Sequence, residues 1–190
     1  KGKAIYNVLA MKSDERVMSL VAVAKGPAAR GTSSALVMVT RRGIMKRVAA
    51  DAFSNVRRSG ITAITLKSDD SLRAAAVTGG SDEILLVTAR GSAIRFRESD
   101  VRLMGRSAAG VKAIRLGAGD EVVGLRALRP GEERDASLLV VMGRGFGKRT
   151  PIKEYKRQKR GGKGIKTAKI TKKNGPIVSA HLVRAEAELI

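Results

Sequence analysis

Three copies of an arginine–glycine pattern are the first feature of this chain that could carry binding chemistry. In each copy an apolar run leads into Arg-Gly, and a second arginine comes four residues after the glycine. The copies are Arg42-Gly43 with Arg47, Arg90-Gly91 with Arg95, and Arg144-Gly145 with Arg149. Guanidinium groups bind phosphates and carboxylates well, so the repetition favours an anion site that recurs around the molecule.

A basic loop that contains glycine follows each of these hairpins. The loops span residues 56–60, 104–110 and 158–164, and their closing glycines are 50 and 54 residues apart. The third loop, Gln158-Lys159-Arg160-Gly161-Gly162-Lys163-Gly164, holds three cations and three glycines in seven residues. Glycines let the backbone approach a phosphate and leave amides free to donate, while lysine and arginine neutralise the charge. A solvated, flexible loop is the alternative, but recurrence in register favours a phosphate site.

The composition favours a polyanionic partner. Among 190 residues, 38 Lys and Arg stand against 17 Asp and Glu, a net charge of +21, which is typical of nucleic-acid binding. Aromatic residues make up 3% of the chain, too few for the stacking platforms that bind single strands. No basic amphipathic helix, signal-peptide pattern or cysteine is found in the sequence. We therefore expect no membrane partner and a cytoplasmic location.

The segments around the loops are predicted to be β-strands. Apolar and polar residues alternate directly after the loops, and apolar runs follow turns at Asp70, Asp120 and Asn174. The alternating segments are 61–66, 111–116 and 165–170, and the later apolar runs are 72–77, 122–128 and 177–183. The pattern of loop, strand and turn recurs about every 50 residues, and such a period is typical of propeller-like repeats. We expect an all-β, partial β-propeller of roughly three to four four-stranded blades over 1–190, with approximate repeats 1–56, 57–104, 105–157 and an incomplete 158–190.

The loop at 158–164 resembles the box Gln-Arg-Arg-Gly-Gly-Lys-Gly of the C-terminal domain of the DNA gyrase A subunit, with Lys159 in place of the first arginine. Residues 43–47, 95–102, 110–116 and 145–150 are also similar to that family. The resemblance therefore covers essentially the whole chain. The resemblance implies a β-pinwheel, a propeller-like disc whose blades exchange strands. It also implies that the basic rim wraps duplex DNA and supports negative supercoiling by a bacterial type II topoisomerase.

Catalysis is expected to lie elsewhere. The sequence contains no recognisable P-loop, catalytic triad or metal cluster, so we expect no catalytic residue, metal site or cofactor in this segment. The resemblance implies that ATP and Mg serve the holoenzyme through other domains and subunits. It also implies that the gyrase B subunit is a partner, reached through the rest of the gyrase A protein.

Other families are compatible with the same residues. The gyrase family has its box in the first blade, whereas here the box follows degenerate copies, so the A subunit of topoisomerase IV is the alternative. An RNA-binding β protein and a propeller that binds proteins are further alternatives, and the poverty of aromatic residues and the high charge weigh against them.

The residues expected to bind DNA are the box and the cations of the hairpins and loops. The box contributes Gln158, Lys159, Arg160, Gly161, Gly162, Lys163 and Gly164, and the others are Arg42, Lys46, Arg47, Arg57, Arg58, Arg90, Arg95, Arg106, Arg144, Lys148 and Arg149. Equivalent residues of a repeat occupy matching points of successive blades, so we expect Arg47, Arg95 and Arg149 on one outer rim beside the loops. In the alternative, these arginines pair with Asp51, Glu98 and Glu154.

Overall fold

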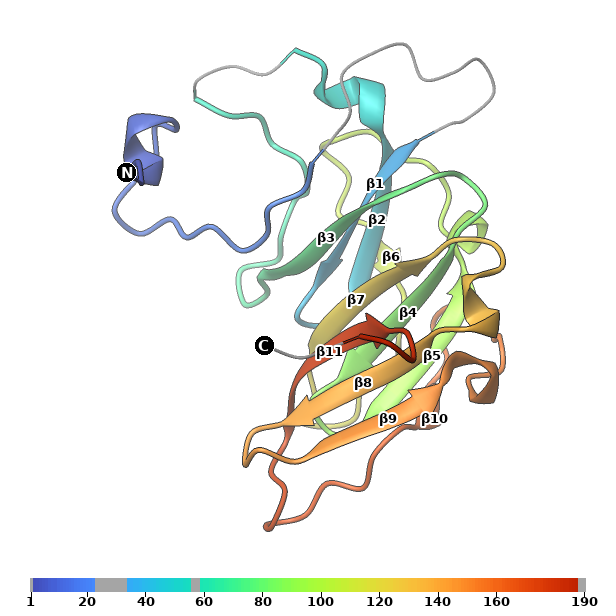
Figure 1. The fold of residues 1–190 in the computed structure, drawn as a ribbon. Helices are drawn as coiled ribbons and strands as arrows, with labels where there is room; N and C mark the ends of the chain where they lie inside the picture. Colours follow the sequence, from blue (N-terminus) through green and yellow to red (C-terminus); the bar gives the residue numbers. More distant parts are fainter. Residues whose placement is uncertain (1, 23–33, 56–58, 188–190) are drawn as a thin grey trace.

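The computed structural model describes residues 2–22, 34–55 and 59–187, and these form three antiparallel sheets stacked on one another (Figure 1). The strand orders are β3-β1-β2-β6, β10-β5-β4-β7 and β11-β8-β9. The strands are β1 (Ala35–Thr40), β2 (Ile44–Ala49), β3 (Leu72–Thr78), β4 (Glu83–Thr88), β5 (Ser92–Arg97), β6 (Val111–Lys112), β7 (Val122–Leu128), β8 (Ser137–Met142), β9 (Gly147–Pro151), β10 (Ile165–Lys166) and β11 (Ile177–Val183). The all-β, propeller-like architecture predicted from the sequence is confirmed.

The helices of the described residues are short 3-10 turns. They are η1 (Ile5–Asn7), η2 (Ala50–Phe53), η3 (Glu98–Asp100), η4 (Glu132–Arg134) and η5 (Ile152–Glu154). Within the same residues, no helix is long and apolar enough to span a bilayer.

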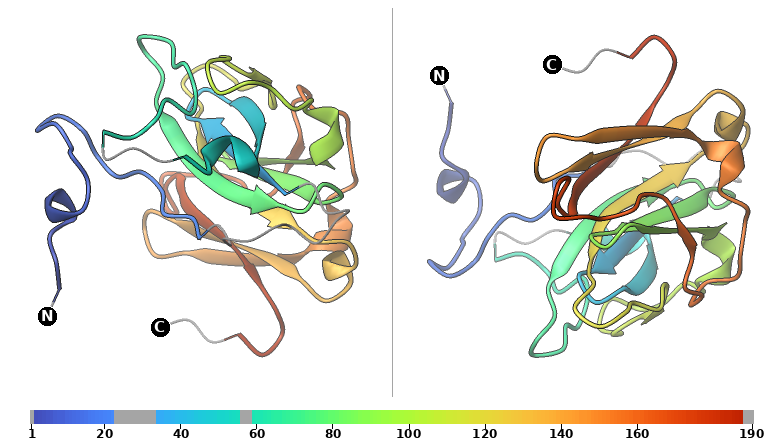
Figure 2. Two further views of the ribbon diagram at one scale, coloured as in Figure 1. Left: turned by 90° about the horizontal axis from the view of Figure 1, so that it is seen from above. Right: turned by 90° about the horizontal axis from the view of Figure 1, so that it is seen from below.

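The first two sheets each take one edge strand from the following repeat, where a repeat is counted from one Arg-Gly hairpin to the next. β6 comes directly after the loop 104–110 and pairs with β2 of the first sheet. β10 comes directly after the loop 158–164 and pairs with β5 of the second sheet. At the opposite edges, β3, β7 and β11 lie close to one another, and the views from above and below show the three sheets fanning out from them (Figure 2). The exchange therefore places both basic loops at the outer edges of the sheets.

The strands after the loops are shorter than predicted, because their partners end. β6 pairs with Ile44 and Met45, and the amide of Ala113 then bonds to the carbonyl of Gly43 in the hairpin turn. Beyond that point the ladder has no strand to extend along, and β10 stops in the same way at the second hairpin. Residues 61–66 form no strand. The two corresponding segments, β6 and β10, each pair with the hairpin of the preceding repeat, and the described residues before 61–66 contain no earlier hairpin with which this segment could pair.

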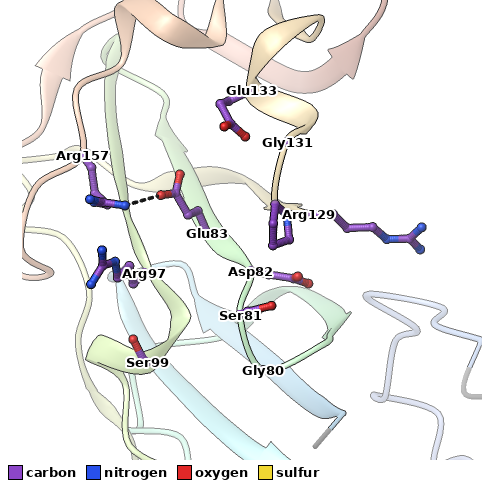
Figure 3. A pocket seen from close by; sticks show the side chains of 11 residues that line it. Gly80, Ser81, Asp82, Glu83, Arg97, Ser99, Arg129, Gly131, Glu133 and Arg157 are labelled. Atoms are coloured by element: carbon purple, nitrogen blue, oxygen red, sulfur yellow. Dashed lines mark hydrogen bonds and ion pairs between the residues drawn. The ribbon is translucent and has the colours of Figure 1, made fainter. Parts of the chain in front are cut away.

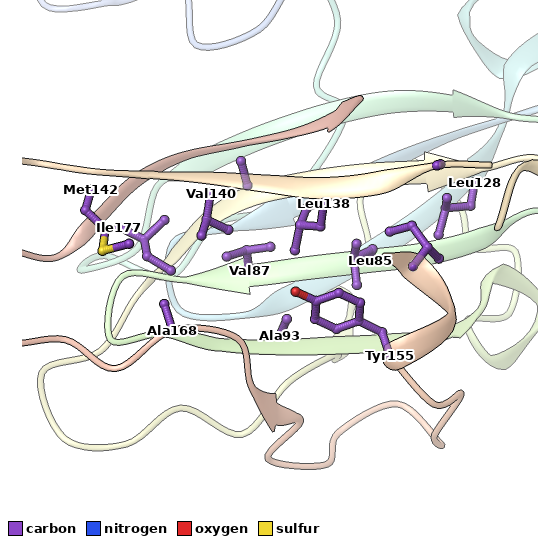
Figure 4. Packing of buried hydrophobic residues seen from close by; sticks show 13 residues of the cluster. Leu85, Val87, Ala93, Leu128, Leu138, Val140, Met142, Tyr155, Ala168 and Ile177 are labelled. Carbon is purple, nitrogen blue, oxygen red and sulfur yellow. The ribbon is translucent and has the colours of Figure 1, made fainter. Parts of the chain in front are cut away.

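The apolar core lies between the sheets, and β4 contributes to both of its halves. Ile84 and Leu86 pack between the first and second sheets, whereas Leu85 and Val87 pack between the second and third. All four side chains are fully buried, which explains why β4 is continuously apolar instead of alternating. Figure 4 shows the second half of the core, where Tyr155 lies among the aliphatic side chains and its hydroxyl bonds to Thr167.

Polar turns hold the tips of the Arg-Gly hairpins. The Oδ1 atom of Asp70 accepts from the amide of Arg42 at 3.0 Å, and that of Asp120 accepts from the amide of Arg90 at 2.9 Å. In the third repeat the carbonyl of Asn174 accepts from the amide of Arg144 at 3.2 Å. The turns predicted from the sequence thus fix the backbone from which these three arginine side chains project.

Candidate nucleic-acid interface

Each described basic loop begins against the hairpin of the preceding repeat. The amide of Met104 donates to the carbonyl of Arg47 at 2.8 Å, and the amide of Gln158 donates to the carbonyl of Arg95 at 2.8 Å. At the other end of the third loop, Gly164 has a φ of +73°, and a Cβ atom there would overlap the carbonyl oxygen of Ala93. Only glycine fits this approach without strain. The loops 104–110 and 158–164 therefore occupy matching positions on two successive sheets.

The cations of the loop 158–164 divide into two kinds. Arg160 is only partly exposed, and its Nε and Nη1 atoms donate to the carbonyls of Asp100 at 2.7 Å and Lys112 at 3.1 Å. Lys159 and Lys163, in contrast, are exposed. The loop is anchored by its arginine and presents its two lysines to solvent.

Most other predicted cations are exposed as expected of an anion-binding surface. They are Arg42, Arg90, Arg106, Arg144, Lys148 and Arg149. Arg42 lies 2.5 Å from Asp69 in an ion pair whose side chains are 54% and 56% exposed, and such exposed pairs are weak. Arg57 and Arg58 lie outside the described residues.

Arg47 and Arg95 do not project from the rim as predicted. The Nη1 atom of Arg47 lies 3.3 Å from a carboxylate oxygen of Glu98, and the two side chains are 14% and 0% exposed. Arg95 pairs with Glu83 and also donates to the carbonyl of Ile152 at 3.3 Å. Their backbones contact the loops, but their side chains bind internal partners. Arg47 reaches Glu98, which follows β5 of the second sheet, whereas Arg95 binds Glu83 on the neighbouring strand of its own sheet and the carbonyl of Ile152, which follows β9 of the third. Only Arg149 of the three is exposed.

Lys46 is also buried, contrary to the prediction that it binds DNA. Its side chain is 0% exposed, and its ammonium group donates to the carbonyls of Ala63, at 2.8 Å, and Arg106. Burial lowers the pKa of this ammonium group. A group so enclosed is not available to a phosphate, because strand β2 directs it onto the inner side of the loops.

Further exposed cations were missed in the sequence. Lys112 and Lys166 lie on β6 and β10, and Arg115 and Lys169 follow at the same register in each segment. The amide of Arg115 donates to the carbonyl of Gly162 at 2.8 Å, so this residue borders the third loop. The sequence does contain a pattern that predicts these cations, since basic residues recur at the polar positions of the alternating segments in two of the three repeats.

A hollow of about 480 Å³ lies between residues 80–83 and 129–133 (Figure 3). Three arginines and three carboxylates line it; they are Arg97, Arg129, Arg157, Asp82, Glu83 and Glu133. Arg157 pairs with Glu83 at 3.0 Å, as the dashed line in Figure 3 marks. Burial raises the pKa of the Asp82 carboxyl, and the charge of Glu98 adds to the effect. The lining charges balance, so the hollow lacks the positive excess of the outer loops.

The chain matches the model of a known family, described as the DNA gyrase C-terminal domain, beta-propeller, over residues 34–78, 82–129 and 143–184. It is 44% identical over 190 residues to the gyrase A protein of Staphylococcus epidermidis and 42% identical to that of Staphylococcus aureus. In both cases the whole chain is covered, but it spans only 21% of the length of the relative.

Solved structures agree with this comparison. A crystal structure of the C-terminal domain of DNA topoisomerase IV superposes with a TM-score of 0.85 at 28% identity, covering 96% of this chain and 55% of the other. A structure of a DNA gyrase A C-terminal domain gives a TM-score of 0.82 at 26% identity, covering 96% and 59%.

Proposed function

Because the chain belongs to the DNA gyrase C-terminal domain family, we propose that it binds duplex DNA along the outer edges of its sheets and bends the duplex around them. The recurrence of exposed cations at matching points of successive sheets carries this proposal. Loops 104–110 and 158–164 start from equivalent hairpin positions, and the exchanged strands β6 and β10 add cations beside them. A stiff duplex costs on the order of 1–6 kcal/mol to bend smoothly by 40–90°, and repeated phosphate contacts along an arc can offset that cost.

The contacts proposed here carry little sequence information. Lysine, arginine and glycine amides bind phosphates, and phosphate contacts set position without reading base edges. The exposed set comprises Arg90, Arg106, Lys112, Arg115, Arg144, Lys148, Arg149, Lys159, Lys163, Lys166 and Lys169, with Arg42 beside Asp69. We expect sequence-independent binding, as in other proteins that wrap DNA through its backbone.

For the parent protein we propose the gyrase A protein of an ATP-dependent type II topoisomerase, DNA gyrase, in the bacterial cytoplasm. In this proposal the segment itself is non-catalytic and its wrapping of DNA supports negative supercoiling. The gyrase B subunit, ATP and Mg serve the holoenzyme through its other parts. The relatives at 42–44% identity favour gyrase over topoisomerase IV, although both families share the fold.

A salt titration tests the binding proposal. A protein that makes about 6–10 phosphate contacts loses roughly 10³–10⁵ in affinity for a random duplex between about 50 and 200 mM salt. Replacing Lys159 or Lys163 by Gln should lower the slope of log affinity against log salt by about 0.9 each. Lys12→Gln is the matched control, since it removes one exposed charge before β1 and should leave the slope unchanged. A flat salt response of the unaltered chain contradicts DNA binding through phosphates.

A further inference from the structure

One backbone carbonyl recurs three residues after each closing glycine of a basic loop, and each copy has a hydrogen-bond donor. The three carbonyls belong to Ala63, Ala113 and Thr167. That of Ala63 accepts from the ammonium of Lys46 at 2.8 Å, and that of Thr167 accepts from the ammonium of Lys148 at 2.8 Å. Lys46 and Lys148 both stand three residues after the glycine of an Arg-Gly hairpin, so the same contact is built twice.

The second repeat satisfies the same carbonyl in another way. Its hairpin has Ile94 at the lysine position, and an aliphatic side chain cannot donate. The carbonyl of Ala113 instead accepts from the amide of Gly161 at 2.6 Å, so the loop 158–164 itself supplies the donor. A Cβ atom at Gly162 would come within 3.5 Å of the Ile94 side chain, which shows how closely this loop packs. Arg160 then holds the loop in place through the carbonyls of Asp100 and Lys112.

Lys46 spans two consecutive segments of the outer edge. Its ammonium group bonds to Ala63, beyond the first loop, and to Arg106, inside the second. The hydroxyl of Thr65 donates to the carbonyl of Ser107 at 2.6 Å and strengthens the same junction. An ammonium with no exposed surface loses its hydration, so it remains charged only where carbonyls replace water.

We propose that Lys46 and Arg160 are positioning residues that lock each basic loop to the segment following the preceding loop, and so fix the spacing of successive DNA contacts. The inference rests on the proposed DNA binding, but it assigns these two cations to the inner side of the contact surface. Lys46 joins 61–66 to 104–110, and Arg160 joins 111–116 to 158–164. A duplex that touches several loops at once requires them at fixed distances, whereas a duplex that touches one loop does not.

The test uses variants that remove the donor geometry with little other change. Lys46→Met keeps the length of the side chain without its ammonium group. Arg160→Lys keeps the positive charge but loses the planar fork that reaches two carbonyls. Lys12→Met controls for the lost charge, and Lys159→Gln is the comparison for a cation proposed to contact phosphate.

Two readouts separate positioning from contact. Hydrogen exchange should accelerate about 10- to 100-fold at the amides of Thr65 and Met104 in Lys46→Met, and at those of Gly161 and Arg115 in Arg160→Lys, because bonds to charged groups are lost. Energy transfer between dyes at the two ends of a short duplex should report less bending for both variants. The salt slope of binding should stay that of the unaltered chain.

Each result decides the matter. Faster exchange with reduced bending and an unchanged slope supports the proposal. Unchanged bending, unchanged exchange, or a slope lowered by about 0.9 in Lys46→Met overturns it, the last because it would make Lys46 a phosphate contact. If the unaltered chain does not bend DNA, the proposed function fails, while hydrogen exchange still tests the locking of the loops. If Lys46→Met does not fold, Arg160→Lys decides, since Arg160 is partly exposed.

Discussion

Removing the carboxylate of Glu98 should destabilise the chain more than any change to an exposed charge. Its side chain is 0% exposed and accepts from Arg47 at 3.3 Å, from the hydroxyl of Thr78 at 2.5 Å and from the amide of Asp82 at 2.7 Å. Glu98→Ala leaves all three donors without this acceptor, and Arg47 is itself only 14% exposed. The variant therefore leaves the positive charge of Arg47 without its ion-pair partner in the interface between two sheets.

The expected cost follows from that burial. Breaking a buried ion pair by removing one partner costs about 3–5 kcal/mol. For a domain of 150–250 residues each kcal/mol lowers the melting temperature by about 2–4 °C, so the fall should be about 6–20 °C. Thermal unfolding followed by circular dichroism measures it.

A double variant separates the ion pair from the packing around it. The position equivalent to Glu98 in the next repeat is Ile152, which is fully buried. Glu98→Ile combined with Arg47→Met removes both charges, and replacing both partners of a buried pair by apolar groups is often nearly neutral. The double variant should melt within a few degrees of the unaltered chain and, since its net charge is the same, bind DNA with the same salt slope.

Two outcomes would refute this reasoning. A fall of less than about 2 °C for Glu98→Ala would mean that the carboxylate is not a required partner of Arg47. A lower salt slope in the double variant would mean that Arg47 contacts phosphate after all, as the sequence pattern had predicted.

Three further outcomes are expected. Gly164→Ala should cost about 1–3 kcal/mol or more in chemical denaturation, because the residue has a φ of +73° and the new methyl group would overlap the Ala93 carbonyl; a loss below about 0.5 kcal/mol would contradict the close approach. Asp70→Ala should cost about 1 kcal/mol by the same assay, since the amide of Arg42 loses its acceptor; an unchanged midpoint would oppose this. Burial raises the pKa of the Asp82 carboxyl, so the folded state holds this proton more tightly and loses stability as the pH rises through that pKa. The unfolding free energy of Asp82→Asn should therefore rise relative to that of the unaltered chain between about pH 4 and 7. A difference between the two free energies that does not change with pH would contradict the shift.

The repeat pattern made the fold predictable to the level of individual hairpins. The apolar runs around residues 35–39, 84–87 and 138–142 became β1, β4 and β8, because each run is long enough to cross a sheet and ends at an Arg-Gly turn. Residues 61–66 did not form the strand that their alternation predicted. Strand pairing depends on a partner elsewhere in the fold, which alternation alone does not specify.

The candidate site was less predictable than the fold. Lys46, Arg47 and Arg95 share the basic pattern of the exposed cations, yet their side chains turn inward. Which face of a strand meets another sheet is set by the stacking of the blades, and the sequence around these residues does not encode it locally. Lys112 and Lys166 were missed for the same reason, since the exchange of β6 and β10 places them at the outer edge.

Wrapping of DNA is the central claim, and the topology of a closed circle tests it most directly. The 190-residue chain is bound to relaxed circular DNA, the circle is relaxed again by a nicking-closing topoisomerase, and the protein is removed. Wrapping should produce a linking-number shift that grows with bound protein and shrinks when Lys159 and Lys163 are both replaced by Gln. An unshifted topoisomer distribution at saturating protein would contradict wrapping, whatever the affinity.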